Sequence, residues 1–227
     1  MTANPKKMTN NAKTAIAALR DNDHPLGRPL ALCLMFETEK DQWLAASVFD
    51  LAIALDAALH IPSESLLAAI RVQWWADALA AETHHTAPLV SQLQDLFEIN
   101  EGLRQQIITL IAHWQSACHD KTRDSTEGWA ATWALIAIRL GHKKEAATAA
   151  DIGHYLHHVV RGQLTHGGHN LDQPQIIALR RDDAGRKRSW LYLAGCFLRY
   201  MARPTADVSH PALGWHMLIW HIFRPPK

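Results

Sequence analysis

The sequence predicts an all-α protein, a single-domain helical bundle of about eight to ten helices. Apolar residues recur at steps of three and four along nearly the whole chain, and runs of strictly alternating β-branched residues are missing. Short breaks, many containing Gly or Pro, join these patterns. With 227 residues, 48% of them hydrophobic and 20% charged, the chain can bury a sizeable core. We expect residues 15–227 to form one domain behind a flexible N-terminus at residues 1–14.

Successive amphipathic stretches define the expected helices in chain order. The patterns cover residues 9–20, 42–59, 62–78, 88–97, 103–118, 129–140, 146–164, 188–201 and 211–223. The fifth pattern is the clearest, and one of its faces must be buried, with Leu103, Ile107, Leu110, Ile111, Trp114 and Cys118. Pro62 fits the first turn of the third helix, where its missing N–H is tolerated. The expected buried stripe of that helix is Leu67, Ile70, Trp74 and Ala78.

The charge balance and the cysteines limit the class of protein. Lys plus Arg number 23 and Asp plus Glu 22, so the formal net charge of +1 gives no strong field for polyanions, and no nucleic-acid partner is expected. Cys33, Cys118 and Cys196 lie far apart in the sequence, which favours a reducing compartment over a disulfide framework. The apolar stretches 30–36 and 129–138 are shorter than the roughly 18 residues of a spanning helix. We expect a cytoplasmic protein, at most peripheral at the inner face of the membrane.

The segment 70–79, Ile-Arg-Val-Gln-Trp-Trp-Ala-Asp-Ala-Leu, is the most unusual in the chain. Its adjacent indoles, Trp74 and Trp75, offer a large apolar area on neighbouring faces, so we expect the helix to be enclosed on more than one side. Arg71 lies one turn away, on or beside the apolar stripe, where its guanidinium needs a partner or a cavity. Together with Asp77, these side chains are candidates for the lining of a ligand cavity.

This segment resembles a characteristic run of the squalene/phytoene synthase family. Three further segments, 19–28, 46–54 and 153–171, are similar to that family, so the resemblance covers most of residues 15–175. It implies the all-α fold of the type I isoprenoid synthases. It also implies a chemistry in which catalytic members condense two prenyl diphosphates, held through Mg²⁺ by two aspartate-rich helices.

The chain lacks the first acidic motif that this chemistry requires. The corresponding helix carries only Asp50 and Asp56, and a separation of six residues sets them about 240° apart on a helix. The resemblance implies paired acids at positions that hold Ala54, Leu55 and Ala58 here.

The second acidic motif is missing as well. When Arg161 is aligned with the arginine of the family, Gly162 and His166 stand where the resemblance implies aspartates. Arg161 followed by His166 resembles a non-catalytic branch that contains the respiratory complex I assembly factors. We therefore expect a non-catalytic protein without a cofactor, which binds a protein partner or an isoprenoid or lipid ligand. Asp50, Arg161 and His166 complete the candidate lining of its cavity.

A polar stripe on the seventh expected helix is another candidate site. Asp151, His154, His158 and Arg161 are separated by steps of three and four residues and align on one face. An acid and two histidines at this spacing can bind Zn²⁺ or another transition metal. The same histidines can instead line the cavity, where Arg71 and Arg161 would help to hold an anionic head group.

Two other functions remain open. A prenyltransferase of the squalene/phytoene synthase type would need Mg²⁺ bound by displaced ligands, such as Asp50, Asp56, Asp77 or Asp151. A metal-binding helical protein would depend on the polar stripe alone.

The last expected helix carries Trp215, Ile219 and Ile222 at helical spacing. Such a stripe suits a peripheral contact with a membrane surface, to which Arg224 and Lys227 would add positive charge. Docking of the helix onto the protein's own core fits the same residues. We favour docking, because aromatic stripes are more often buried in a core.

Overall fold

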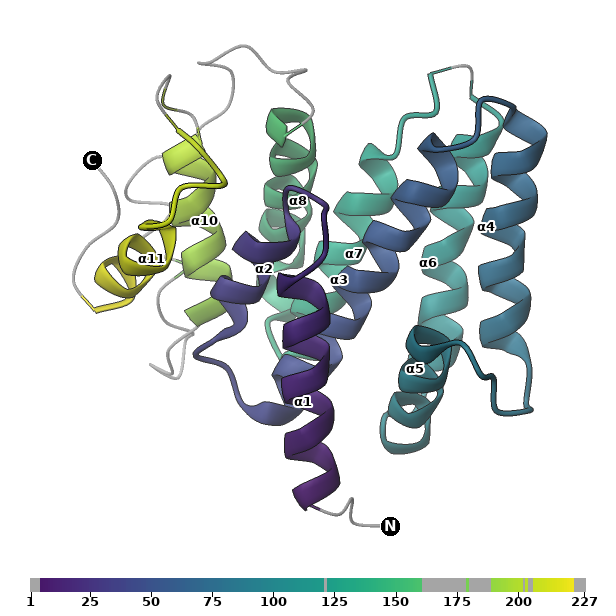
Figure 1. Cartoon of the computed structure of the whole chain (residues 1–227), viewed down its shortest axis with the longest axis horizontal. Helices are drawn as coiled ribbons and strands as arrows, with labels where there is room; N and C mark the ends of the chain where they lie inside the picture. The colour runs from purple at the N-terminus through teal and green to yellow at the C-terminus, as the bar shows by residue number, and fades with distance from the viewer. Residues whose placement is uncertain are drawn as a thin grey trace.

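The computed structural model describes residues 5–120, 122–160, 179, 189–201, 203 and 206–222. Over these residues the chain forms ten α-helices, one 3₁₀ turn (Lys143–Glu145) and no strand, which confirms the predicted fold class (Figure 1). The helices are α1 (Pro5–Arg20), α2 (Gly27–Leu34), α3 (Glu39–His60), α4 (Ser65–Ala80), α5 (Pro88–Ile99), α6 (Leu103–Cys118), α7 (Thr126–Arg139), α8 (Ala146–Val160), α10 (Ser189–Met201) and α11 (Leu213–Ile222).

Helix α3 lies at the centre of the bundle, in contact with α1, α2, α4, α5, α6 and α7. It begins at an N-cap, where Thr38 Oγ1 accepts a hydrogen bond from the Asp41 amide at 3.3 Å. Glu39 and Asp41 place negative charge in its first turn, which stabilises the positive end of the helix dipole. By length and hydropathy, α3 is the one described helix that could cross a membrane, but 78% of its apolar window is buried inside the bundle. Such burial is typical of a core helix.

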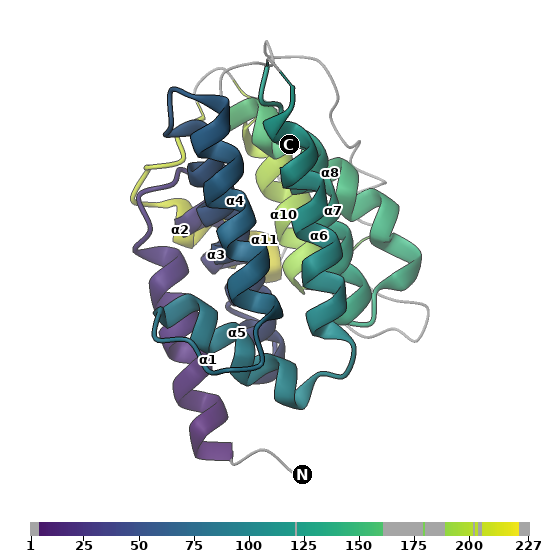
Figure 2. The same cartoon turned by 90° about the vertical axis from the view of Figure 1, so that its right-hand side faces the viewer.

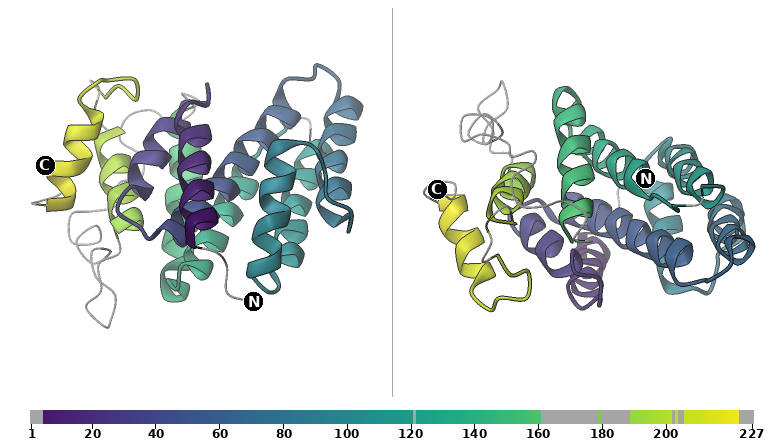
Figure 3. Two further views of the ribbon diagram at one scale, coloured as in Figure 1. Left: turned by 60° about the horizontal axis from the view of Figure 1, so that its bottom comes forward. Right: turned by 90° about the horizontal axis from the view of Figure 1, so that it is seen from above.

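The other helices extend the bundle to either side of α3. On one side, α4 and α6 pack together, and α5 contacts both of them (Figure 2). On the other side, α10 packs against α2 and α8, and α11 covers parts of α10 and α2. Helices α4 and α11 therefore lie at opposite ends of the described structure (Figures 1 and 3).

Tryptophan side chains fill the core around α6, α7, α8 and α10. Four of them are fully buried: Trp114, Trp129, Trp133 and Trp190. Two glycines admit indoles at close range. A Cβ atom added at Gly128 would lie 2.4 Å from Cε2 of Trp114, and one added at Gly153 would lie 2.2 Å from Cδ1 of Trp133. The close approach of α7 to α6 and α8 thus depends on the absence of a side chain at these positions.

Helix α1 begins earlier than the sequence predicts. It starts at Pro5 instead of at residue 9, so most of the segment 1–14 that was expected to precede the domain lies in a helix. Ala12, Ala15 and Leu19 are all buried on one face of α1 and join the core.

Helix α2 lies between the first two expected helices and begins inside a break expected at residues 23–29. Gly27 and Pro29 suggest a loop, but Pro29 falls in the first turn of the helix, where proline is tolerated. Leu30, Cys33 and Leu34 are buried and hold this short helix against the core.

Helix α4 begins at Ser65 rather than at Pro62, and its buried face differs from the predicted one. The buried side chains are Ala68, Val72, Ala78 and Leu79. Leu67, Ile70 and Trp74 are exposed, so the expectation of a helix enclosed on more than one side is wrong. Because α4 lies at one end of the bundle, the face that it packs against α3 and α6 carries mostly small side chains.

Candidate functional site

An apolar hollow of about 340 Å³ lies between α3 and α4. Its lining consists of Ala54, Ala57, Ala58, Ile61, Arg71, Trp74 and Trp75. The volume is within the range of roughly 300–1,000 Å³ that is usual for small-molecule pockets. Ala54 and Ala58 occupy positions at which the resemblance to the synthases implies metal-binding acids. The lining contains no carboxylate.

The structure brings three predicted cavity residues of α4 together at this hollow. Arg71 lines it and remains exposed, so its guanidinium is the one cationic group of the lining. The rings of Trp74 and Trp75 meet edge to face with their centroids 5.0 Å apart, and Trp74 is 43% exposed. Asp77 is not part of the lining, and its carboxylate accepts a hydrogen bond from Gln73 Nε2 at 2.7 Å. The hollow therefore combines an apolar wall with a single positive charge.

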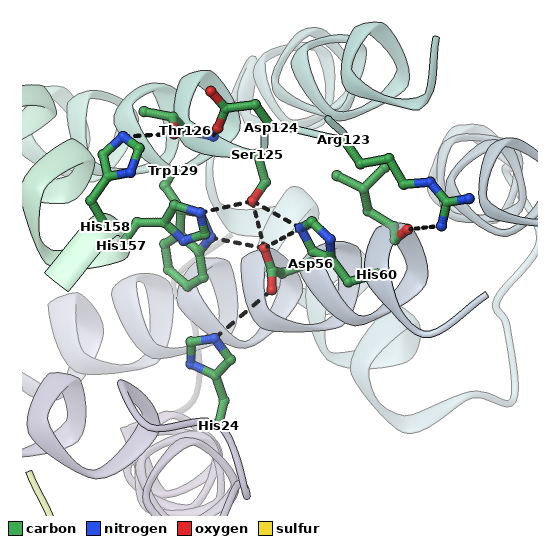
Figure 4. Close-up of polar contacts among 11 residues, drawn as sticks. His24, Asp56, His60, Arg123, Asp124, Ser125, Thr126, Trp129, His157 and His158 are labelled. Carbon is green, nitrogen blue, oxygen red and sulfur yellow. Dashed lines mark hydrogen bonds and ion pairs between the residues drawn. The ribbon is translucent and has the colours of Figure 1, made fainter. Parts of the chain in front are cut away.

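A second site lies on another side of α3, where a buried carboxylate collects donors from separate parts of the chain (Figure 4). Asp56 is 5% exposed. Its Oδ1 accepts hydrogen bonds from Ser125 Oγ at 2.7 Å and from Trp129 Nε1 at 3.2 Å. His60 Nε2 lies 3.6 Å from Oδ1, and His24 Nε2 lies 4.0 Å from Oδ2. These contacts join the α1–α2 loop, α3 and the start of α7.

Helix α8 joins the same cluster through His157, which is buried. His157 Nε2 lies 3.0 Å from Ser125 Oγ, and His60 Nε2 lies 3.3 Å from the same hydroxyl oxygen. Because an ionised Asp56 can only accept, the Ser125 hydroxyl must donate to it and can then accept from both imidazoles. The rings of His24 and His157 also stack on the indole of Trp129. We call Asp56, His24, His60, Ser125, Trp129 and His157 the Asp56 cluster. The donors and acceptors of its hydrogen bonds are compatible with one another.

A parallel chain of bonds runs through the next residue of α7. Thr126 donates from its amide to Asp124 Oδ1 at 3.0 Å and from its hydroxyl to the same oxygen. His158 Nε2 lies 3.2 Å from Thr126 Oγ1. Burial by itself would raise the pKa of Asp124. The two bonds from Thr126 and the nearby His158 and His157 outweigh it, so this pKa is lowered. Two successive residues at the start of α7 each link an aspartate to a histidine of α8.

The turn before α7 is tied to the turn that leads into α4. Arg123 has a left-handed backbone conformation, with φ of +49°. Its guanidinium donates to the carbonyls of Pro62 and Ser63. The Asp56 cluster and the α3–α4 connection beside the hollow are therefore held by neighbouring residues of one loop.

The Asp56 cluster contains a serine, a histidine and an aspartate, but its arrangement does not suit nucleophilic catalysis. In a serine hydrolase the aspartate orients the histidine, and the serine is open to the substrate. Here Asp56 bonds to Ser125 itself, and Ser125 is 1% exposed. The cluster is better suited to fixing α3, α7 and α8 together.

Asp50 and Asp56 have different partners, in agreement with their predicted divergence. Asp50 is half-buried and accepts a hydrogen bond from Asn22 Nδ2 at 3.1 Å. Burial raises the pKa of Asp50, and the hydrogen bond from Asn22 offsets part of that effect. The structure gives α3 no pair of carboxylates directed at one ion.

The structure brings two members of the polar stripe of α8 close together. The rings of His154 and His158 lie 4.8 Å apart, but His158 Nε2 is directed at Thr126, and Asp151 is exposed. Burial, together with the neighbouring His158, lowers the pKa of His154. Within the part of the chain that the structure describes, no three His, Cys, Asp or Glu side chains are placed to hold a metal ion. Arg161 and His166 lie outside the described residues.

Comparison of the chain with protein-family models, with curated proteins and with solved structures gives no match. The function must therefore be inferred from the two sites.

Sequence reasoning missed most of the Asp56 cluster. Ser125, Trp129, His157, His24 and His60 come from separate segments, and no spacing rule links them. The one available signal was Asp56, an acid within an otherwise apolar core helix, which must be paired when it is buried.

Proposed function

We propose that this protein is a non-catalytic member of the squalene/phytoene synthase type that binds an anionic isoprenoid or related lipid in the hollow between α3 and α4. One observation carries the proposal. Ala54 and Ala58, at positions where a synthase needs metal-binding acids, line the same hollow as Arg71, Trp74 and Trp75. An apolar wall without a carboxylate cannot hold Mg²⁺, which takes oxygen ligands.

The lining favours a ligand with an apolar chain and an anionic end. Alanine and tryptophan side chains bury hydrocarbon, with a gain of about 0.8 kcal/mol per CH₂ group. Arg71 offers a planar guanidinium that can bind a phosphate through two parallel hydrogen bonds. A role in the assembly of a respiratory complex, as in the branch that the sequence resembles, would then depend on binding and not on turnover.

The test uses farnesyl diphosphate as the probe, with farnesol and inorganic pyrophosphate as partial probes. Calorimetry without Mg²⁺ should show that farnesyl diphosphate binds more tightly than either partial probe. Arg71→Gln should weaken its binding about tenfold, the effect of losing roughly 1.4 kcal/mol. Ala57→Phe should fill the hollow and abolish binding. Arg20→Gln, on α1, is the control and should bind like the wild type.

The same protein is then incubated with farnesyl or geranylgeranyl diphosphate and Mg²⁺. No pyrophosphate and no squalene- or phytoene-type hydrocarbon should form. Turnover that is lost in Asp50→Asn or Asp77→Asn would overturn the proposal in favour of a prenyltransferase with displaced ligands. Absence of farnesyl diphosphate binding, or equal binding by the Ala57→Phe variant, would overturn the lipid site.

A protein partner is the second candidate, favoured by the exposed face of α4. Leu66, Leu67 and Ile70 are exposed beside the hollow. Exposed apolar patches of this kind mark interaction sites more often than scattered single residues do. Leu66→Asp should then abolish co-purification with a defined subunit of a respiratory complex while farnesyl diphosphate still binds. Unchanged co-purification would exclude this face as the contact.

A further inference from the structure

Helix α11 is apolar on two opposite sides, and the protein covers only one of them. Leu213, Met217 and Trp220 are buried against the bundle, whereas Trp215, Ile219 and Ile222 are exposed. The predicted docking of this helix is therefore achieved by other residues than the predicted stripe. A helix that is apolar all round is normally covered all round. The outer stripe of α11 lacks such a cover over the described residues.

The end of α2 enlarges this outer surface. Met35 and Phe36 are exposed, and the ring of Phe36 stacks on His221 of α11 with centroids 3.8 Å apart. A groove of about 370 Å³ lies between α2 and α11 and includes Met35, Phe36 and Trp215 in its lining. We call the exposed apolar residues Met35, Phe36, Trp215, Ile219 and Ile222 the α11 face. Helix α11 lies at one end of the structure (Figure 3).

The charges around the α11 face favour an anionic occupant. The Arg28 guanidinium donates to the carbonyls of Ser209 and Pro211, at 3.2 and 3.3 Å, and so lies beside the loop that enters α11. From residue 208 onward the sequence contains no Asp or Glu, and it continues beyond α11 with Arg224 and Lys227. Positive charge next to exposed Trp and Ile side chains is the combination that binds the surface of an anionic bilayer.

Three acids that are close in sequence to this surface accept hydrogen bonds. The Glu37 carboxylate accepts a hydrogen bond from the amide of Trp190 at 2.8 Å. Glu39 accepts from Thr9, and Asp207 accepts from the amide and hydroxyl of Ser209. These bonds come from neutral donors, so the three carboxylates stay negative, and the attraction of an anionic surface must come from the basic groups and the exposed apolar side chains together.

We infer that the α11 face is a docking surface for an anionic lipid bilayer, with Trp215 and Ile219 inserted at the level of the head groups. An indole that is 69% exposed gains most from such a site, because its ring is apolar and its N–H can bond to head groups or water. The surface lies at the opposite end of the structure from the α3–α4 hollow, so the inference does not depend on the proposed lipid pocket.

The test is flotation with vesicles of phosphatidylcholine alone and of phosphatidylcholine with phosphatidylglycerol. The wild type should float with the anionic vesicles and much less with the neutral ones, and added salt should weaken binding. Ile219→Gln should lower the partition coefficient about tenfold, as the loss of one inserted apolar side chain predicts. Ile138→Gln on α7 is the matched control, since Ile138 is 42% and Ile219 47% exposed, and it should float like the wild type.

Three results would overturn the inference. The first is absence of flotation with either vesicle, and the second is equal flotation of the two isoleucine variants. The third is a dimer, measured by light scattering in the absence of lipid, that Ile219→Gln converts to a monomer. The α11 face would then bind a second copy of the chain instead of a membrane.

Discussion

Replacement of Asp56 by leucine should destabilise the fold strongly while leaving the shape of α3 unchanged. Leucine has the same branched shape, with methyl groups larger than the carboxylate oxygens, and suits a helix, but it cannot accept a hydrogen bond. The Ser125 hydroxyl and the Trp129 indole N–H would lose the acceptor that they reach at 2.7 and 3.2 Å. Each buried donor left without a partner costs about 1–3 kcal/mol. The desolvation cost that the carboxylate no longer incurs offsets part of this loss.

We therefore expect Asp56→Leu to lower the free energy of unfolding by about 3 kcal/mol. In urea denaturation followed by far-ultraviolet circular dichroism, that loss corresponds to a midpoint about 1 M lower at an unchanged slope. Asp77→Leu is the control, because it makes the same substitution at an exposed position of α4, and its effect should stay within about 0.5 kcal/mol.

A double-mutant cycle with Ser125→Ala tests the contact itself. Once Ser125 has lost its hydroxyl, Asp56→Leu should cost less, with a coupling of about 0.5–3 kcal/mol. A loss below about 1 kcal/mol for Asp56→Leu, or strictly additive effects of the two substitutions, would refute the view that this cluster holds α3, α7 and α8 together.

Two further substitutions test packing and pH dependence. Gly153→Ala should destabilise the protein by about 1–3 kcal/mol in the same urea assay, because the added Cβ would meet the Trp133 ring. Gly214→Ala is its control: the nearest atom to a Cβ there lies 3.8 Å away, and an equal loss would contradict the packing explanation. Burial raises the pKa of Asp50, so the folded state binds its proton more tightly and stability falls as pH rises from the ordinary aspartate range through the folded pKa. Asp50→Asn should accordingly be more stable than the wild type at neutral pH and lose that advantage at low pH; an advantage that persists in acid would exclude this cause.

The helical class could be predicted because one face of most helices is apolar at regular spacing. Helix α6 is the clearest example, since every member of its predicted stripe is buried: Leu103, Ile107, Leu110, Ile111, Trp114 and Cys118. The same rule failed on α4. There, Leu67, Ile70, Trp74 and Ala78 form the predicted stripe, but only Ala78 is buried and the other three are exposed. Periodicity indicates which face is apolar, and it does not show what lies against that face.

The candidate sites were predictable to different degrees. Arg71, Trp74 and Trp75 are close in sequence on one helix, so their shared position at the hollow follows from local geometry. The Asp56 cluster depends on the packing of three helices and a loop, and His157 is 32 residues away from Ser125. Its contacts follow from the tertiary fold, which no local pattern encodes.

The contact between Trp133 and Gly153 fixes how α7 and α8 pack against each other. An indole enters the space beside a glycine at only one rotation and one height of the facing helix, so α8 cannot turn or slide by a residue without expelling the ring. The positions of His157 and His158 on α8 therefore depend on a packing contact to which no polar group of the Asp56 cluster contributes. Polar side chains at the start of α7 and on α8 could therefore be replaced while the backbone of the two helices stays in place. New catalytic or binding residues could be introduced at these positions without a change of helix packing.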